Sequence, residues 1–92
     1  MSKIAQRLSK YENTTFKFYE TARHGYLLVP NEIISDFEIR FTITPFSFQT
    51  KIDKKTWVYL EEDCDAGTFI EAYKAYYGKE PKMIQNDRVL CL

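Results

Sequence analysis

The alternation of apolar and polar residues is clearest in WVYLEEDCDAGTFIEAYKAYYG, residues 57–78. Val58 and Leu60 alternate with larger or charged residues, and this period of two, with its β-branched and aromatic content, predicts a strand that buries one face. Beyond an acidic turn, four apolar residues recur at helical spacing: Phe69, Ala72, Tyr73 and Tyr76. That spacing predicts a helix over residues 68–77, which should end at Gly78 because glycine adopts the left-handed conformation without steric cost.

Further extended segments are predicted by the same period of two and, at residues 26–29, by a short apolar run. Residues 16–18 and 26–29 should pair as a hairpin around a turn at residues 21–25. In residues 37–44 every odd position is Phe or Ile and every even position is polar, which predicts a half-exposed strand. Residues 46–49 repeat the alternation, so this strand should either end or bend at the intervening proline.

Polar residues and glycine mark the turns and a short helix. Asn31 is a suitable N-cap for a helix over residues 31–36, whose two isoleucines would face the sheet. Gly25 can supply a positive φ to the first turn, and the charged residues 51–56 predict another turn.

The two ends of the chain carry weaker patterns. Apolar spacing predicts a short helix at the N-terminus with three inward residues: Ile4, Leu8 and Tyr11. Residues 82–84 and 89–92 should be extended around a turn at residues 86–87. The whole pattern predicts one domain over residues 1–92, of class α+β: a mainly antiparallel sheet of four or five strands, with one long and one or two short helices packed on one face.

Composition narrows the function classes. Thirteen basic and 13 acidic residues give a net charge of zero, so we expect neither direct nucleic-acid binding nor attraction to an anionic membrane. No apolar run could span a bilayer, and the N-terminus lacks the apolar core of a secretion signal, so we expect a cytoplasmic protein. Cys64 and Cys91 are too few and too far apart for a disulfide framework or a zinc site, and both should be reduced thiols.

Four carboxylates lie within five residues, and we call this group the acidic corner: Glu61, Glu62, Asp63 and Asp65. Asp63 or Asp65 could cap the long helix by accepting hydrogen bonds from its first backbone N–H groups. One cap is enough, so the others form either a solvated charged turn or an anionic patch for a basic partner protein. Because these side chains should be exposed, reversing Glu61 and Glu62 to Lys should weaken binding and leave the fold intact.

Aromatic residues make up 16% of the chain, more than a small core can enclose. Trp57 and Tyr59, on the outward face of the predicted strand, would edge the anionic patch. Helix tyrosines more often pack in a core than form a binding stripe, and Tyr77 is the one expected to reach solvent. These three aromatic residues and the acidic corner are the predicted partner-binding residues. The aromatic surplus also suits a homo-oligomer that buries it against a second copy.

Candidate catalytic groups are few. The single histidine, His24, could pair with Cys64, which lies near a helix start where a thiolate can be stabilised. The flanking Asp63 and Asp65 oppose that thiolate and favour a small buried thiol. For His24 the simpler interpretation is a turn residue whose ring bonds a nearby carbonyl or carboxylate. Neither the ligand spacing of a Ca²⁺ loop nor a glycine-rich phosphate cradle occurs, so we expect no metal and no cofactor.

Two short strings carry a resemblance: HGYLLVP at residues 24–30 and YLEEDCDAGTF at residues 59–69. They resemble a loose group of small uncharacterised proteins of phages and other mobile elements, in which HGYLxVP is followed by YLEEDCD and a helix. The resemblance covers the middle of the chain and departs at residues 37–48. It implies a phage or mobile-element setting, hence the host cytoplasm, and no chemistry. Small proteins from that setting are often inhibitors of host machinery, including anti-CRISPR proteins, which occlude a partner's surface.

These observations favour a small non-enzymatic protein-binding module, and with the resemblance a phage-encoded, anti-CRISPR-like inhibitor that occludes a basic surface of a host complex. The alternative is a small enzyme or metal-dependent hydrolase that uses the acidic corner and His24. The two differ in geometry, because an enzyme needs a concave site that gathers His24 with the acidic corner, whereas a binding module needs an exposed patch.

Overall fold

The structure, a computed structural model, describes residues 10–89, with side chains as far as residue 86. Ile4 and Leu8 of the predicted N-terminal helix lie outside the described residues, as does Cys91. Five strands form one sheet: β1 (Thr15–Glu20), β2 (Gly25–Pro30), β3 (Phe48–Ile52), β4 (Lys55–Glu61) and β5 (Lys82–Val89). The described helices are α2 (Asn31–Asp36), the 3₁₀ helix η1 (Arg40–Thr42) and α3 (Asp65–Tyr77).

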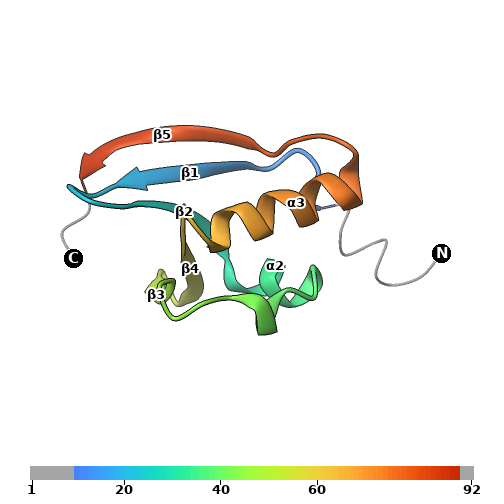
Figure 1. Cartoon of the computed structure of the whole chain (residues 1–92), viewed down its shortest axis with the longest axis horizontal. Coiled ribbons are helices and arrows are strands. Elements are labelled where there is room, and N and C mark those ends of the chain that lie inside the picture. Colours follow the sequence, from blue (N-terminus) through green and yellow to red (C-terminus); the bar gives the residue numbers. More distant parts are fainter. Residues whose placement is uncertain (1–9, 90–92) are drawn as a thin grey trace.

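The strands lie in the order β3-β4-β2-β1-β5. Every ladder is antiparallel except that of β5, which runs parallel to β1. β4 runs in the same direction as β1 and β5, because β1 and β4 are both antiparallel to β2. The chain must therefore cross over between β4 and β5, and α3 makes this connection. The sheet bends, so that β5, β1 and β2 pass over α3 while β4 and β3 turn down beside it (Figure 1). The predicted α+β class, with a mainly antiparallel sheet, one long helix and a short one, is confirmed.

The core lies between α3, α2 and one face of the sheet. Two cross-strand pairs of β2 and β4 line that face, Leu27 with Leu60 and Val29 with Val58. Phe69 of α3 is fully buried and meets Phe16 of β1 edge to face, with ring centroids 5.2 Å apart. Tyr73, also buried, donates its hydroxyl to the carbonyl of Tyr11 at 3.1 Å. Burying a side chain of this size stabilises the fold by about 2–3 kcal/mol. The predicted inward face of the strand is confirmed, as are Phe69 and Tyr73 of the predicted helix face, whereas Tyr76 of that face is exposed.

The predicted strand at residues 37–44 is wrong, because α2 ends in a left-handed turn instead. Glu38 has a φ of 59°, and its N–H donates to the carbonyl of Ser35 at 3.0 Å. The N–H of Ile39 donates to the carbonyl of Ile34 at 3.1 Å. These two bonds form the Schellman termination of a helix, in which the residue after the turn packs on the last helical turn.

The apolar positions of this segment therefore do not share one strand face. Phe37 and Ile39 are buried, Ile43 is half-buried and Phe41 is fully exposed. The hydrogen bonds that terminate α2 explain the burial of Phe37 and Ile39. They satisfy carbonyls that α2 leaves free, and they turn both side chains into the core. η1 then carries Phe41 into solvent.

The predicted helix caps are also wrong. Pro30, not Asn31, precedes α2, and α3 begins at Asp65 with Cys64 at the N-cap position. Neither helix has a side-chain hydrogen bond at its N-cap, so neither Asp63 nor Asp65 serves as one. The side chains of Asn31 and Asp65 instead accept hydrogen bonds from other segments, Asn31 from Arg40 and Asp65 from Thr44. These bonds are favoured over a cap because they fix tertiary structure as well as a helix end.

The glycines act as local geometry requires. Gly78 ends α3 as predicted, with a φ of 71° and its N–H bonded to the carbonyl of Lys74 at 2.8 Å. Gly25 does not have the positive φ expected of it. A Cβ there would lie 2.3 Å from Cζ of Phe18 and 2.8 Å from the carboxyl carbon of Glu62, so close packing explains this glycine.

Two predicted turns differ from the structure. Of the charged residues 51–56 only Asp53 and Lys54 form the turn, with φ values of 52° and 69° that suit a two-residue hairpin between β3 and β4. At the other end β5 continues through the predicted turn at residues 86–87. The ladder with β1 is irregular at this point: Gln85 pairs with Phe18 and Val89 with Glu20, so residues 86–88 lie in a register shift that interrupts the pairing without ending the strand.

Candidate functional site

The acidic corner is divided into buried and exposed carboxylates. Glu61 at the end of β4 and Asp65 at the start of α3 are 5% and 1% exposed, whereas Glu62 and Asp63 between them are exposed. The expectation that all four reach solvent is therefore wrong for two of them. Because an unpaired charge is costly to bury, the two buried carboxylates need hydrogen bonds, and each has them.

Asp65 holds the segment that leads into β3. Its carboxylate accepts the backbone N–H of Thr44, 3.0 Å from both oxygens, and the Thr44 hydroxyl at 2.7 Å. The hydroxyl of Ser47 also donates to Asp65 and in turn accepts the backbone N–H of Glu61 at 3.0 Å. Asp65 thus ties residues 44–47 to the start of α3 and the end of β4.

Glu61 closes the turn between β4 and α3. Its Oε2 accepts the backbone N–H of Asp63 at 2.9 Å, and its Oε1 lies 3.6 Å from Nδ1 of His24. That separation allows an ion pair when the ring is protonated and is longer than a hydrogen bond. The backbone N–H of His24 donates to the hydroxyl of Thr21 at 2.9 Å. The prediction that His24 is a turn residue is confirmed, but the hydrogen bond that its ring was expected to make is not, because the Glu61 carboxylate beside it lies only within ion-pair distance.

An open pocket of about 220 Å³ lies next to these groups, and we call it the corner pocket: it is lined by His24, Tyr26, Phe46, Glu61, Asp63 and Cys64. Tyr26 is buried and its ring centroid is 6.3 Å from that of His24, whereas Phe46 is 68% exposed. Two carboxylates and two aromatic rings therefore share one concave surface. The sequence interpretation missed Tyr26 and Phe46, although an apolar residue directly after Pro45, where a ladder must be interrupted, was a usable signal for Phe46.

Cys64 is exposed where it lines the corner pocket, so the expected buried thiol is wrong. Partial desolvation, followed by the nearby charges of Glu61 and Asp65, raises the pKa of the Cys64 thiol above its ordinary value. The predicted opposition of the neighbouring carboxylates to a thiolate is confirmed in direction. A thiol that holds its proton in this way is a weak nucleophile at neutral pH.

The sheet face opposite the helices carries a group of aromatic rings beside the corner pocket. Tyr59 of β4 lies at its centre, with centroid distances of 5.7, 6.3 and 4.9 Å to three rings, those of Tyr19, Tyr26 and Phe48. Burial, and then the neighbouring Tyr19, raises the pKa of the Tyr59 hydroxyl. Ring contacts of this kind, two of them edge to face, stabilise a sheet surface that none of the described helices covers.

Trp57 shares this face two residues earlier in β4, with the ammonium of Lys55 5.0 Å from its ring. It and Tyr59 point outward as predicted, but both are half-buried. Tyr77 lies at the other end of α3, about 18 Å along the helix from its start. Its ring packs 4.4 Å from that of Tyr73, and burial raises its pKa to about 12. Tyr76, at 42% exposure, is the helix tyrosine that reaches solvent, so the expectation for Tyr77 is wrong.

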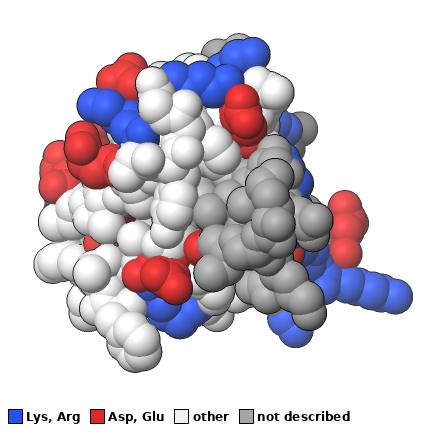
Figure 2. Space-filling view, turned by 90° about the vertical axis from the view of Figure 1, so that its right-hand side faces the viewer, with Lys and Arg blue, Asp and Glu red and all other residues white. Residues whose placement is uncertain are grey.

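The surface away from the corner pocket carries charges of both signs (Figure 2). On the face shown in Figure 2, acidic and basic side chains are interspersed. Among the described residues no three His, Cys, Asp or Glu side chains converge as metal ligands would. Within residues 10–89 no helix combines the length and the apolar character that crossing a bilayer requires.

Comparisons with known proteins found no matching family model, no matching curated protein and no matching solved structure. The function is therefore inferred from the residues and geometry of this chain.

Proposed function

We propose that this protein is a non-enzymatic protein-binding module that receives a basic side chain of its partner in the corner pocket. The observation that carries the proposal is the combination of carboxylates and aromatic rings in one concavity. A Lys or Arg side chain has an apolar stem and a cationic head. Aromatic walls suit the stem and attract the cation through its contact with the ring face, and the carboxylates neutralise the charge.

Phe46 supplies the contact area. Its ring is 68% exposed, while its backbone N–H donates to the hydroxyl of Thr44 at 3.3 Å. Thr44 is itself bound to the buried Asp65, so the segment that carries the ring is fixed before any partner arrives. Fixing a contact in advance lowers the entropic cost of association, and aromatic residues of this kind dominate many binding sites.

Glu62 and Asp63 supply the attraction. Both are exposed, and neither has an ion-pair partner among the residues that the structure describes. Asp63 lines the corner pocket, whereas Glu62 lines a separate pocket with Phe18 and Ile70 and adds its charge to the corner without facing the corner pocket. Two uncompensated carboxylates at this corner would speed the approach of a basic surface, and added salt would screen that effect. Trp57 and Tyr59 form the neighbouring aromatic rim on β4, whereas Tyr77 lies too far along α3 to share one small contact.

The resemblance to small phage proteins suggests which partner this is. A host complex that normally holds nucleic acid has a basic surface, and a module bound there would occlude it. The place of action would then be the host cytoplasm. This part of the proposal rests on the resemblance alone, and the pocket chemistry stands without it.

A salt series tests the proposal in the cell extract of a host. The double variant Glu62→Lys/Asp63→Lys and the single variant Phe46→Ala should lose partners that the wild-type protein retains at low salt. Glu71→Lys, an equal reversal on the exposed side of α3, is the matched control and should retain them. Capture that is identical in all four proteins and insensitive to salt would refute binding through this corner.

The same pocket favours a second function, that of a small hydrolase. His24 and Glu61 are 3.6 Å apart in a concavity, as a general base and its orienting carboxylate would be. The raised pKa of Cys64 leaves water or a substrate group as the nucleophile. Activity towards simple ester or phosphodiester substrates that disappears in His24→Ala and survives in Phe46→Ala would replace the binding proposal with this one.

A further inference from the structure

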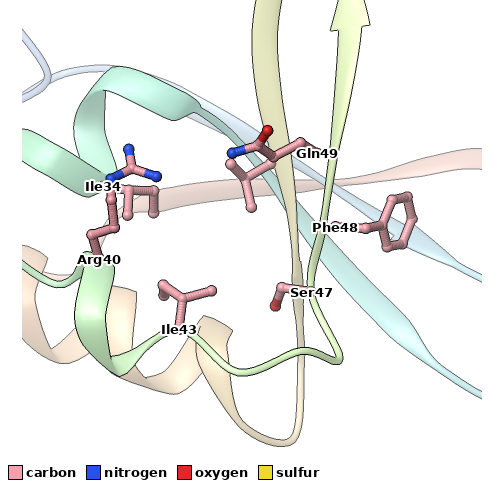
Figure 3. A pocket seen from close by; sticks show the side chains of 7 residues that line it. Ile34, Arg40, Ile43, Ser47, Phe48 and Gln49 are labelled. Carbon is pink, nitrogen blue, oxygen red and sulfur yellow. The ribbon is translucent and has the colours of Figure 1, made fainter.

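A second pocket, of about 210 Å³, lies between α2 and η1 on one side and β3 on the other. Arg40 and Gln49 are its exposed polar residues, and Ile34, Ile43 and Val58 form its apolar wall. We call it the Arg40 pocket. Figure 3 shows Arg40 and Gln49 approaching it from opposite elements, with Ile43 between them, while the ring of Phe48 turns away.

The guanidinium of Arg40 is held in place by hydrogen bonds to neutral groups. Its Nε and Nη2 donate to the hydroxyl of Ser35 at 3.2 and 2.8 Å. Nη2 also donates to the carbonyl and the side-chain oxygen of Asn31, at 3.2 and 3.1 Å. This explains why Asn31 is not a helix cap: its side chain positions an arginine from outside the helix.

The charge of Arg40 has no counterpart among the residues that the structure describes. No carboxylate among the described residues lies within ion-pair distance of it, and its Nη1 makes no hydrogen bond to any of them. A guanidinium normally uses its planar fork of donors on a carboxylate or a phosphate. Here one edge of the fork is fixed by the protein and the other is free.

A neutral donor and an apolar wall accompany this free edge. The side-chain amide of Gln49 lies 3.5 Å from the same oxygen of Asn31, so Gln49 and Arg40 converge on one point. Gln49 is paired with Val58 across the β3–β4 ladder, so both face the helix side of the sheet. Ile34 and Val58 are buried and Ile43 is half-buried, and the pocket therefore reaches the edge of the core.

We propose that the Arg40 pocket binds a carboxylate joined to a short branched alkyl group. The carboxylate meets Nη1 of Arg40 and the amide of Gln49, and the alkyl group packs on Ile34, Ile43 and Val58. The volume is below the roughly 300 Å³ at which pockets for drug-sized ligands begin, so the ligand is small. Two sources supply this chemistry, a free branched-chain acid and the carboxyl-terminal residue of a peptide.

This inference is independent of the proposed function. The Arg40 pocket is cationic with aliphatic walls, whereas the corner pocket is anionic with aromatic walls, and no residue lines both. Loss of basic-partner binding would leave the Arg40 pocket proposal untouched, and failure of this ligand would leave the corner pocket proposal untouched.

Titration of the ¹⁵N-labelled full chain with 3-methylbutanoate tests the proposal by nuclear magnetic resonance. The side-chain amide of Gln49 and the backbone amides of residues 40–44 and 46–49 should shift together, with a dissociation constant on the order of 1 mM for so small a ligand. The neutral 3-methylbutanamide should bind at least about tenfold more weakly, because it cannot form a charge-assisted pair with Arg40. N-acetylglycyl-valine separates the sources, since tighter binding than 3-methylbutanoate identifies a peptide terminus.

Two variants and one control complete the experiment. Arg40→Gln should abolish the shifts, and Arg23→Gln, the same change in the exposed turn before β2, should not alter them. Gln49→Ala leaves the bonds of Arg40 to α2 in place, and it should weaken binding even if Arg40→Gln does not fold. Equal binding of the acid and the amide, no shifts with either carboxylate, or unchanged binding in Gln49→Ala and Arg40→Gln would each overturn the proposal.

Discussion

Asp63 and Asp65 carry the same side chain two residues apart, and the structure uses them in opposite ways. Asp65 is buried and accepts hydrogen bonds from Thr44 and Ser47, which hold the segment before β3. Asp63 is exposed and lines the corner pocket, with only its backbone N–H engaged, to Glu61. The four carboxylates of the acidic corner therefore form two pairs. Glu61 and Asp65 are buried and hold the surrounding segments, and Glu62 and Asp63 are exposed.

The difference teaches how a neutral protein can offer a local charge. Burying Glu61 and Asp65 is tolerable because backbone and hydroxyl donors replace water around them. The donors to Asp65 come from the segment that carries Phe46, so this buried carboxylate also positions the exposed ring. The anionic group at the surface therefore consists of two exposed carboxylates, Glu62 and Asp63, and not of the four that the sequence suggests.

The largest contrast should appear in stability at Asp65. Asp65→Ala leaves the N–H of Thr44 and the hydroxyls of Thr44 and Ser47 without their acceptor, and we expect a loss of about 3 kcal/mol. Asp63→Ala should cost less than about 0.5 kcal/mol, because its side chain is in water. Urea unfolding of both variants measures the difference. Equal effects would show that Asp65 is not the clamp described here.

The contrast between Glu61 and Glu62 should be smaller. Glu61→Ala removes the acceptor for the N–H of Asp63 and leaves a small void, so we expect a loss of about 1.5 kcal/mol. Glu62→Ala should again stay below about 0.5 kcal/mol. Thermal melts of the two variants, run alongside wild type, decide the comparison. A Glu61 variant as stable as the Glu62 variant would mean that its burial contributes nothing.

The reactivity of Cys64 measures the effect of the neighbouring carboxylates on its thiol. Because its thiol pKa is raised, the thiolate fraction at a given pH is lower than that of an ordinary cysteine, and alkylation should be correspondingly slower. In the Cys91→Ser variant, the rate of Cys64 alkylation by iodoacetamide should still increase with pH in a range where the alkylation rate of a cysteine-containing peptide is already constant. Asp63→Asn should speed the reaction modestly. A rate profile matching the peptide would show that the carboxylates do not act on the thiol.

The sequence predicted the buried positions of β4 and most of those of α3, where the spacing of the apolar residues matches the element that forms. Val58 and Leu60, or Phe69 and Tyr73, are buried by a regular spacing that local structure cannot alter without exposing them. Residues 37–44 show the opposite, because their alternation is regular and yet hydrogen bonds at the end of α2 decide the backbone.

The candidate site was less predictable than the fold. The acidic corner was visible as charge, but its division depends on Thr44 and Ser47, which lie 21 and 18 residues from Asp65 in the chain. Phe46 joins the corner only because that segment is held there. Contacts between distant segments leave no periodic signal in the sequence, and both pockets are made of such contacts.

A titration with two short peptides tests the central claim most directly. One peptide contains a single arginine in an otherwise neutral sequence, and the other carries citrulline, its uncharged counterpart, in that position. We predict that the arginine peptide shifts the amides of His24, Phe46, Asp63 and Cys64 in ¹⁵N spectra, that salt weakens binding, and that Phe46→Ala or Asp63→Asn reduces the affinity several-fold. Equal binding of the citrulline peptide, or shifts that fall elsewhere in the chain, would contradict it.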